Sequence, residues 1–331
     1  MGVPDTLTKA YVAQDEIFAD AFNYLIYDGK PVIQPDQLHE LDTAGIALPY
    51  GTETATVPVQ KYRDVLKELS VSLVGMADKD AAYLILGIEN QTAIHYAMPV
   101  RNMLYDALQY TGQVAKAKKS YKQDEQKPDE QKQEKLTKEE FLSGFKKGDK
   151  LIPVITLVIY FGANEWDAPV SIHEMLTDVK PELLPFISDY KVNLIAPASM
   201  DDDSFHKFKS GLGAVLMCIK HSQDNDFSVM KSDMFQRLDR RTADLINVVS
   251  GMKVNLDEYT DKEGNTNMCK AYENSQTMAK NEGIAIGEEK GANLMAKLAM
   301  LLVKDGRTDD IVRAGSDEKY RNLLFKEYRL A

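Results

Sequence analysis

The stretch that decides the fold is residues 81–88, Ala-Ala-Tyr-Leu-Ile-Leu-Gly-Ile, followed at 89–91 by the polar residues Glu-Asn-Gln. A nearly continuous apolar run of this length indicates a strand that is buried on both faces. Residues 151–161 form a second apolar run, and residues 192–196 form a shorter third one. Segments with helical spacing lie between these runs, so we expect an α/β core with a mixed central sheet.

Helical periodicity marks most of the remaining chain. Apolar residues recur at helical spacing over residues 14–27, and we also expect helices over residues 98–115 and 201–219. Residues 57–74 have strand-like composition. From residue 227 onward the pattern is helical, over residues 233–250, 267–304, 309–314 and 317–328. We therefore expect two domains, a core over residues 1–224 and an all-helical extension over residues 225–331.

One segment differs sharply from its surroundings in composition. Residues 116–150 hold 11 Lys against 8 acidic residues, so this segment is positive although the formal net charge of the whole chain is −11. The part over residues 117–140 is rich in Lys, Glu and Gln, and such polar runs are commonly solvated and flexible. We interpret it as a flexible insertion; a frayed end of the preceding helix is the alternative.

Length and composition exclude several classes of protein. The chain has 331 residues, with 40 Lys and Arg against 51 Asp and Glu, so a global basic footprint for nucleic acid is absent. No apolar run approaches the ~20 residues that cross a bilayer. The N-terminal residues lack the pattern of a secretory signal, and Cys218 and Cys269 make no disulfide framework. These features predict a cytoplasmic protein that does not act at a membrane.

Two carboxylates at strand ends form the candidate site. Side chains alternate along a strand, so Gly87, Glu89 and Gln91 share one face. Asp64 stands at or inside the preceding strand-like segment, and it converges with Glu89 if the two strands pair. Adjoining carboxylates either share a proton or hold a cation, and Mg²⁺ takes one or two carboxylates together with water and phosphate. The alternative is a pair of ordinary carboxylates that face solvent.

Three short blocks resemble the Rpn family of recombination-promoting nucleases or putative transposases, also called YhgA-like. They are Arg-Asp-Val-Leu at 63–66, Leu-Gly-Ile-Glu-Asn-Gln at 86–91 and Ala-Met-Pro-Val-Arg-Asn-Met-Leu-Tyr at 97–105. The similarity covers residues 14–223, and residues 62–105 are its most specific part. The resemblance implies a PD-(D/E)XK nuclease core, with a mixed central sheet flanked by helices. It also implies a Mg²⁺-dependent DNA endonuclease linked to recombination or transposition.

The resemblance assigns catalytic roles to three residues. Asp64 and Glu89 would bind Mg²⁺ or another divalent cation, which would activate the attacking water and polarise the scissile phosphate. Gln91 stands where many enzymes of this superfamily have Lys. Its amide can orient a water molecule, but it carries no charge to stabilise the transition state. The alternative is therefore a weak or inactive nuclease-fold protein that binds DNA or protein.

Further residues are candidates for contacts with DNA. Arg101 and Tyr105 match family positions and lie one helical turn apart. Arg101 could contact a phosphate, or it could bridge a carboxylate in a structural pair with a packed Tyr105. Lys116, Lys118 and Lys119 follow on the same predicted helix and are candidates for contacts with the DNA backbone.

The C-terminal helices offer a candidate for self-association. Gly283, Gly287 and Gly291 recur every four residues and share one helical stripe. Such a stripe allows two helices to pack closely, within the chain or between copies, so a homo-oligomer through this region is one expectation. A flexible hinge is the alternative, because glycine weakens a helix by about 1 kcal/mol.

Overall fold

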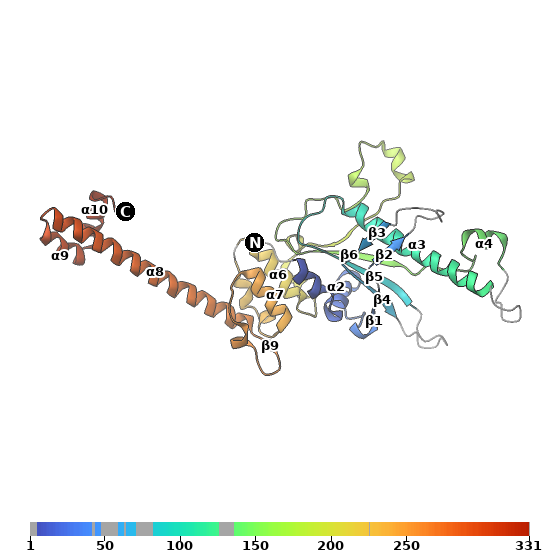
Figure 1. Ribbon diagram of the computed structural model, residues 1–331, viewed down its shortest axis with the longest axis horizontal. Coiled ribbons are helices and arrows are strands. Elements are labelled where there is room, and N and C mark those ends of the chain that lie inside the picture. Colours follow the sequence, from blue (N-terminus) through green and yellow to red (C-terminus); the bar gives the residue numbers. More distant parts are fainter. Residues whose placement is uncertain are drawn as a thin grey trace. The chain divides into compact units, whose positions relative to one another are not determined.

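The computed structural model describes residues 5–41, 44–47, 59–62, 64–70, 82–125, 136–224 and 226–330. The chain forms two compact units, Met1–Cys269 and Lys270–Ala331, which are described separately (Figure 1). The boundary predicted after residue 224 falls inside the first unit. The predicted division into a nuclease-like core over residues 1–224 and an extension over residues 225–331 stays a prediction. No described helix is long and apolar enough to span a membrane.

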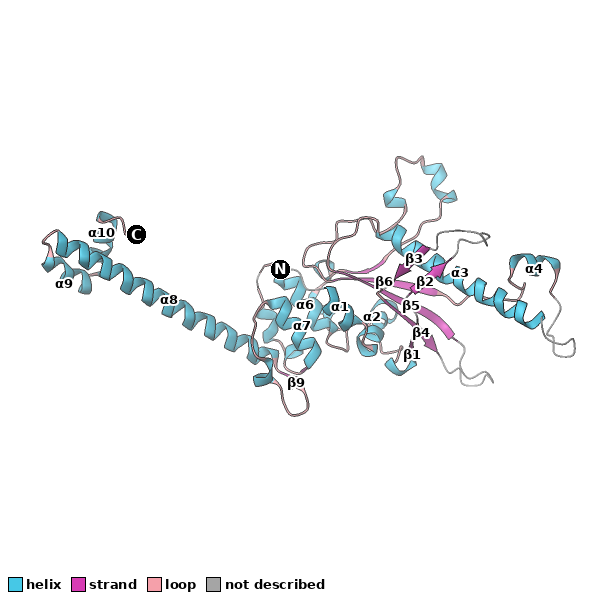
Figure 2. Cartoon of the chain, in the orientation of Figure 1, coloured by secondary structure: helices cyan, strands magenta, loops and turns pink. Residues whose placement is uncertain are grey.

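A five-stranded mixed sheet forms the centre of the first unit, with the strand order β1-β4-β5-β6-β7 (Figure 2). The strands β1 (Leu38–Glu40), β4 (Val65–Ser70) and β5 (Ala82–Gln91) pair in antiparallel fashion. The strands β6 (Val154–Tyr160) and β7 (Asn193–Ile195) continue the sheet in parallel. The predicted α/β fold with a mixed sheet is confirmed.

Helices cover both faces of β5. The side chain of Asn90 donates to Thr8 in α1 (Asp5–Val12), whereas that of Glu89 contacts Arg101 in α3 (Met98–Glu125). Successive strand residues point to opposite faces, so α1 and α3 lie on opposite sides of the sheet. Leu86 and Ile88 on one face are buried, and so are Ile85 and Glu89 on the other, as expected for a strand covered on both faces.

Long-range contacts attach α1 to the rest of the first unit. The hydroxyl of Tyr11 lies 2.9 Å from the hydroxyl of Thr242 in α7 (Arg240–Ser250), a residue 231 positions later. Its neighbour α2 (Asp15–Tyr27) contains Asp20, whose carboxylate accepts from the backbone N–H groups of Lys209 and Ser210. Asp20 thereby holds the loop that precedes α6 (Leu212–Ser222).

The helix α3 extends into the segment interpreted as a flexible insertion, which agrees with the alternative of a helix end for residues 117–125. The flexibility of the segment stays a prediction. The helix continues to Glu125, ten residues beyond the predicted end, so residues 117–125 are helical. Lys, Gln and Ala favour helices, which explains why this polar segment extends the preceding helix. Residues 126–135 lie outside the described residues. After them, α4 (Lys138–Ser143) begins at Thr137, whose side chain accepts from the backbone of Glu140 at 3.2 Å.

The helix predicted over residues 201–219 is divided into α5 (Asp202–Phe205) and α6. A Cβ at Gly213 would clash with the backbone oxygen of Phe205, so the two helices approach closely at this glycine. The helix predicted over residues 233–250 is also divided. Only α7 is α-helical there, and Asp239 caps it by accepting from the N–H of Thr242 at 3.0 Å.

The shorter elements complete the first unit. Two small antiparallel sheets are formed by β2 (Ala44–Ala47) with β3 (Val59–Tyr62), and by β8 (Leu238–Asp239) with β9 (Asn265–Thr266). The 3₁₀ helices span Pro35–Gln37, His173–Met175, Pro181–Phe186, Pro197–Ser199, Ser228–Lys231, Asp233–Phe235 and Leu256–Tyr259.

The second unit is helical. It contains most of α8 (Met268–Lys304), together with α9 (Thr308–Ser316) and α10 (Glu318–Glu327), close to the helices predicted there. Its core is built on four buried side chains, Leu298, Leu302, Ala314 and Leu324. Gly283, Gly287 and Gly291 are exposed, and a Cβ added to any of them meets nothing within 4 Å. A homo-oligomer through this region stays a prediction.

Candidate functional site

Strand pairing places Asp64 beside Glu89. Val65 pairs with Ile88 in the antiparallel β4–β5 ladder, so the preceding Asp64 adjoins the position of Glu89. The Asp64 carboxylate accepts from the backbone N–H of Asn90 at 3.0 Å. This hydrogen bond holds Asp64 against the residue that directly follows Glu89. The two strands therefore pair, which was the condition for bringing Asp64 close to Glu89.

Glu89 lies at the end of β5 and is fully buried, with 0% of its side chain exposed. Its Oε2 lies 3.0 Å from Nη2 of Arg101, which α3 supplies. An ionised carboxylate away from water costs several kcal/mol unless a partner compensates it, and Arg101 provides that partner. The solvent-facing alternative is therefore wrong for Glu89, because α3 covers the face of β5 that carries it.

Arg101 connects the buried carboxylate to the edge of the site. Its Nε donates to the hydroxyl of the buried Tyr105 at 3.1 Å, and 29% of its side chain is exposed. Burial opposes the charge of Arg101, but attraction to Glu89, the Tyr105 hydrogen bond and the charge of Asp64 together raise its pKa. Arg101 thus stays charged and is attracted electrostatically by both carboxylates. The structural pair expected as one alternative is present; a phosphate contact stays a prediction.

A second cation at the site comes from α1. Nζ of Lys9 lies 3.3 Å from Oδ1 of Asp64, and the two side chains are 46% and 19% exposed. The same helix holds Asn90, whose amide donates to Asp5 and Thr8 at 3.0 and 2.8 Å. Sequence reasoning missed this helix and these partners, since no local pattern links residues 5–9 to residues that follow more than 50 positions later.

Gln91 is also buried at the end of β5. Its Nε2 donates to the backbone oxygen of Asn90 at 2.9 Å, so this donor is engaged by the adjacent residue. Gln91 shares the face of Glu89 by strand alternation. Its expected role in orienting a water molecule stays a prediction.

The donors that the strand pairing brings together are the two carboxylates of Asp64 and Glu89. No group of three or more His, Cys, Asp and Glu side chains that could hold a metal gathers among the described residues, whereas zinc usually requires three or four such ligands. Mg²⁺ needs only one or two carboxylates, with water and phosphate completing its shell. Asp64 and Glu89 fit this requirement if Arg101 releases Glu89.

Asp202, in the acidic run 201–203, begins α5 and pairs with Lys220 at 2.7 Å.

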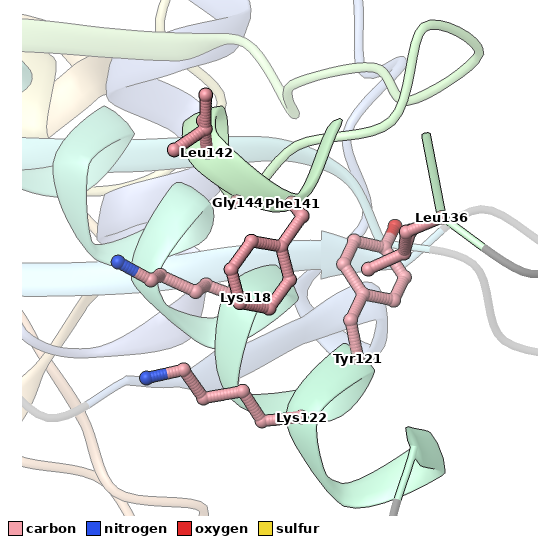
Figure 3. A pocket seen from close by; sticks show the side chains of 7 residues that line it. All are labelled: Lys118, Tyr121, Lys122, Leu136, Phe141, Leu142 and Gly144. Atoms are coloured by element: carbon pink, nitrogen blue, oxygen red, sulfur yellow. The ribbon is translucent and has the colours of Figure 1, made fainter. Parts of the chain in front are cut away.

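The lysines expected to contact DNA occupy two environments on α3. Lys116 and Lys119 are exposed, whereas Lys118 is partly buried. A Cβ added to Gly144 would lie 2.8 Å from Cγ of Lys118. Figure 3 shows Lys118 beside Phe141 in a pocket of about 180 Å³ where α3 meets α4. Lys118 therefore packs between these helices, unlike the other two lysines.

Residues 136–245 match the family model described as putative transposase, YhgA-like. The match confirms the family resemblance. The description associates this YhgA-like family with transposition. The matched segment carries β6, β7, α6 and the first half of α7, and it begins after Asp64, Glu89 and Gln91. No curated protein and no solved structure gives a significant match.

Proposed function

We propose that the protein is a divalent-metal-dependent DNA endonuclease that acts in recombination or transposition. The single observation that carries this proposal is the pair of Asp64 and Glu89, which adjoin at the ends of two paired central strands. The YhgA-like match supports the association with transposition. The order of a helix, three antiparallel strands, a helix and a parallel strand supports a PD-(D/E)XK type of core.

The site residues would divide the work of phosphodiester hydrolysis. Asp64 and Glu89 would hold Mg²⁺, which supplies an activated water and a polarised phosphate when it is bound. Gln91 would hold the attacking water by a hydrogen bond. Arg101 would exchange its partner, leaving Glu89 for a phosphate oxygen, because guanidinium groups bind both anions in a similar planar geometry. Lys9 would remain beside Asp64 at the exposed side of the site.

The decisive experiment measures nicking of supercoiled plasmid by the full-length protein, in Mg²⁺ and in EDTA. We expect nicking only with Mg²⁺, and a loss of at least about 100-fold in Asp64→Asn and Glu89→Gln. Glu40→Gln is the matched control, because Glu40 is an exposed carboxylate on β1 of the same sheet. Nicking that survives in both site variants, or that persists in EDTA, would contradict the proposal.

A second candidate function is DNA binding without efficient cleavage. It is favoured by the ion pair that neutralises Glu89 and by the uncharged amide of Gln91. It predicts that the protein binds duplex DNA, whereas neither Mg²⁺ nor Mn²⁺ produces nicks. Restoring charge with Gln91→Lys is the informative variant, since a gain of metal-dependent nicking would show that the missing cation limits catalysis.

A further inference from the structure

The helix α3 presents Arg101 and several lysines on one side. Lys119 follows Arg101 by 18 residues, which is five full turns and returns to the same angular position. Lys116 and Lys122 lie about 60° to either side of this line. The rise of the helix separates Arg101 from Lys119 by about 27 Å along the axis.

Small residues lie between these cations. Gly112 and Ala115 are exposed within about 40° of the same line, and a Cβ added to Gly112 meets nothing within 4 Å. A ligand can therefore approach the helix backbone closely in this part. We call the exposed residues of this side the α3 basic face; they are Gly112, Ala115, Lys116, Lys119, Lys122 and the uncharged Gln123.

Among the acidic side chains of α3 that the structure describes, two lie away from this face. Asp106 and Asp124 are each about 140° from the line through Arg101. Asp106 is buried and accepts from the hydroxyls of Thr156 and Tyr190, at 2.6 and 2.5 Å. The α3 basic face is therefore positive in a chain whose formal net charge is −11. Such a local field attracts a polyanion although the whole protein is acidic.

The length of this arrangement matches duplex DNA. The 27 Å from Arg101 to Lys119 corresponds to about eight base pairs at ~3.4 Å each. A small anion could bridge two neighbouring lysines at most, because residues three apart on a helix adjoin, whereas a continuous phosphate backbone can engage all three lysines together. We propose that the α3 basic face binds the DNA backbone about eight base pairs from the phosphate at the Asp64–Glu89 site. This inference rests on the proposed endonuclease function.

The test compares two triple variants of the full-length protein with equal charge change. The first variant removes the three positive charges of the α3 basic face by Lys116→Gln/Lys119→Gln/Lys122→Gln. The second variant removes three exposed lysines elsewhere in the same positive segment by Lys138→Gln/Lys147→Gln/Lys150→Gln. Binding of a 30-base-pair duplex is followed by fluorescence anisotropy in EDTA over a series of salt concentrations. The slope of log K against log salt is negative, and we expect the first variant to reduce its magnitude by about 2.7, which is ~0.9 for each of three lost phosphate contacts.

The second triple variant should reduce the magnitude of that slope by less than about 1. Equal losses in the two variants would indicate a diffuse field and overturn the proposal, as would an unchanged slope in the first. Two variants at Gly112 separate DNA binding from folding. Gly112→Glu should bind the duplex at least tenfold more weakly than Gly112→Gln, and the melting temperatures of both variants should be at or above that of the wild-type protein. Equal affinity in this pair would also overturn the proposal.

Binding and cleavage can fail separately. If the duplex binds through the α3 basic face but no metal-dependent nicking occurs, the endonuclease function is wrong and the surface stands. If nicking depends on Asp64 and Glu89 but DNA binding does not depend on the α3 lysines, the endonuclease function stands and the proposed DNA-binding role of the α3 basic face is wrong.

Discussion

Replacing Arg101 with Met should leave the Glu89 carboxylate buried without its charged partner. Removing one member of a buried ion pair typically costs about 3–5 kcal/mol. Arg101 is 29% exposed while Glu89 is 0% exposed, so some water can reach the vacated position and we expect about 3 kcal/mol. Domains are stable by only about 5–15 kcal/mol, so this is a large fraction of the total.

Urea denaturation followed by tryptophan fluorescence measures this loss. The sequence has a single Trp, and Trp166 packs edge-on against Tyr160 at 5.3 Å in the first unit. Its signal therefore reports the unit that contains the ion pair, and linear extrapolation gives the free energy of unfolding. Arg240→Met is the matched control, since Arg240 pairs with Asp244 and Asp257 on the surface and the variant should lose about 1 kcal/mol or less.

A double-mutant cycle decides whether the ion pair is the cause. Replacing both partners of a buried pair by apolar residues is often neutral, so Arg101→Met/Glu89→Met should recover at least about 2 kcal/mol of the loss. The reasoning is refuted if Arg101→Met costs less than about 1 kcal/mol at pH 7. It is equally refuted if the effects of the two single changes simply add.

Three further outcomes are expected. Mg²⁺ at ten times its dissociation constant for Arg101→Met should stabilise this variant by about 1.4 kcal/mol in urea titrations. The same Mg²⁺ concentration should stabilise the wild-type protein by less. Asp20→Ala should cost about 2 kcal/mol in the same assay, because the N–H groups of Lys209 and Ser210 lose the buried carboxylate that accepts from them. Burial and the hydrogen bond to Asp149 raise the pKa of Tyr121 to about 12. The folded protein therefore favours the neutral phenol, so this contribution to stability is complete below pH 10 and is lost between pH 10 and 12, whereas Tyr121→Phe lacks this decrease.

Local sequence information was sufficient for the central strands. The apolar run at residues 81–88 predicts a strand buried on both faces, and the register of β4 and β5 then brings Asp64 beside Glu89. Both inferences need only alternation along one strand and pairing with a neighbour. Two interpretations of the polar tail of α3 stayed open in the sequence, because its composition is typical both of solvated loops and of exposed helices; the structure has a helix over residues 117–125.

Tertiary contacts account for what the sequence could not predict. The ion pair of Glu89 with Arg101 depends on where α3 packs, and the pair of Asp64 with Lys9 depends on a short helix at the start of the chain. The break between α5 and α6 depends on the close approach at Gly213. None of these contacts follows from spacing along one segment, because each joins elements that the chain brings together only after folding.

The attachment of α1 has a consequence for the order of events during synthesis. Its Tyr11 bonds to Thr242, so α1 is synthesised 231 residues before the residue that anchors it. Lys9 belongs to the same helix and reaches Asp64 only when α1 is seated. The electrostatic environment of the candidate site is therefore completed late, and a nascent chain that ends before α7 carries both carboxylates without their full set of partners.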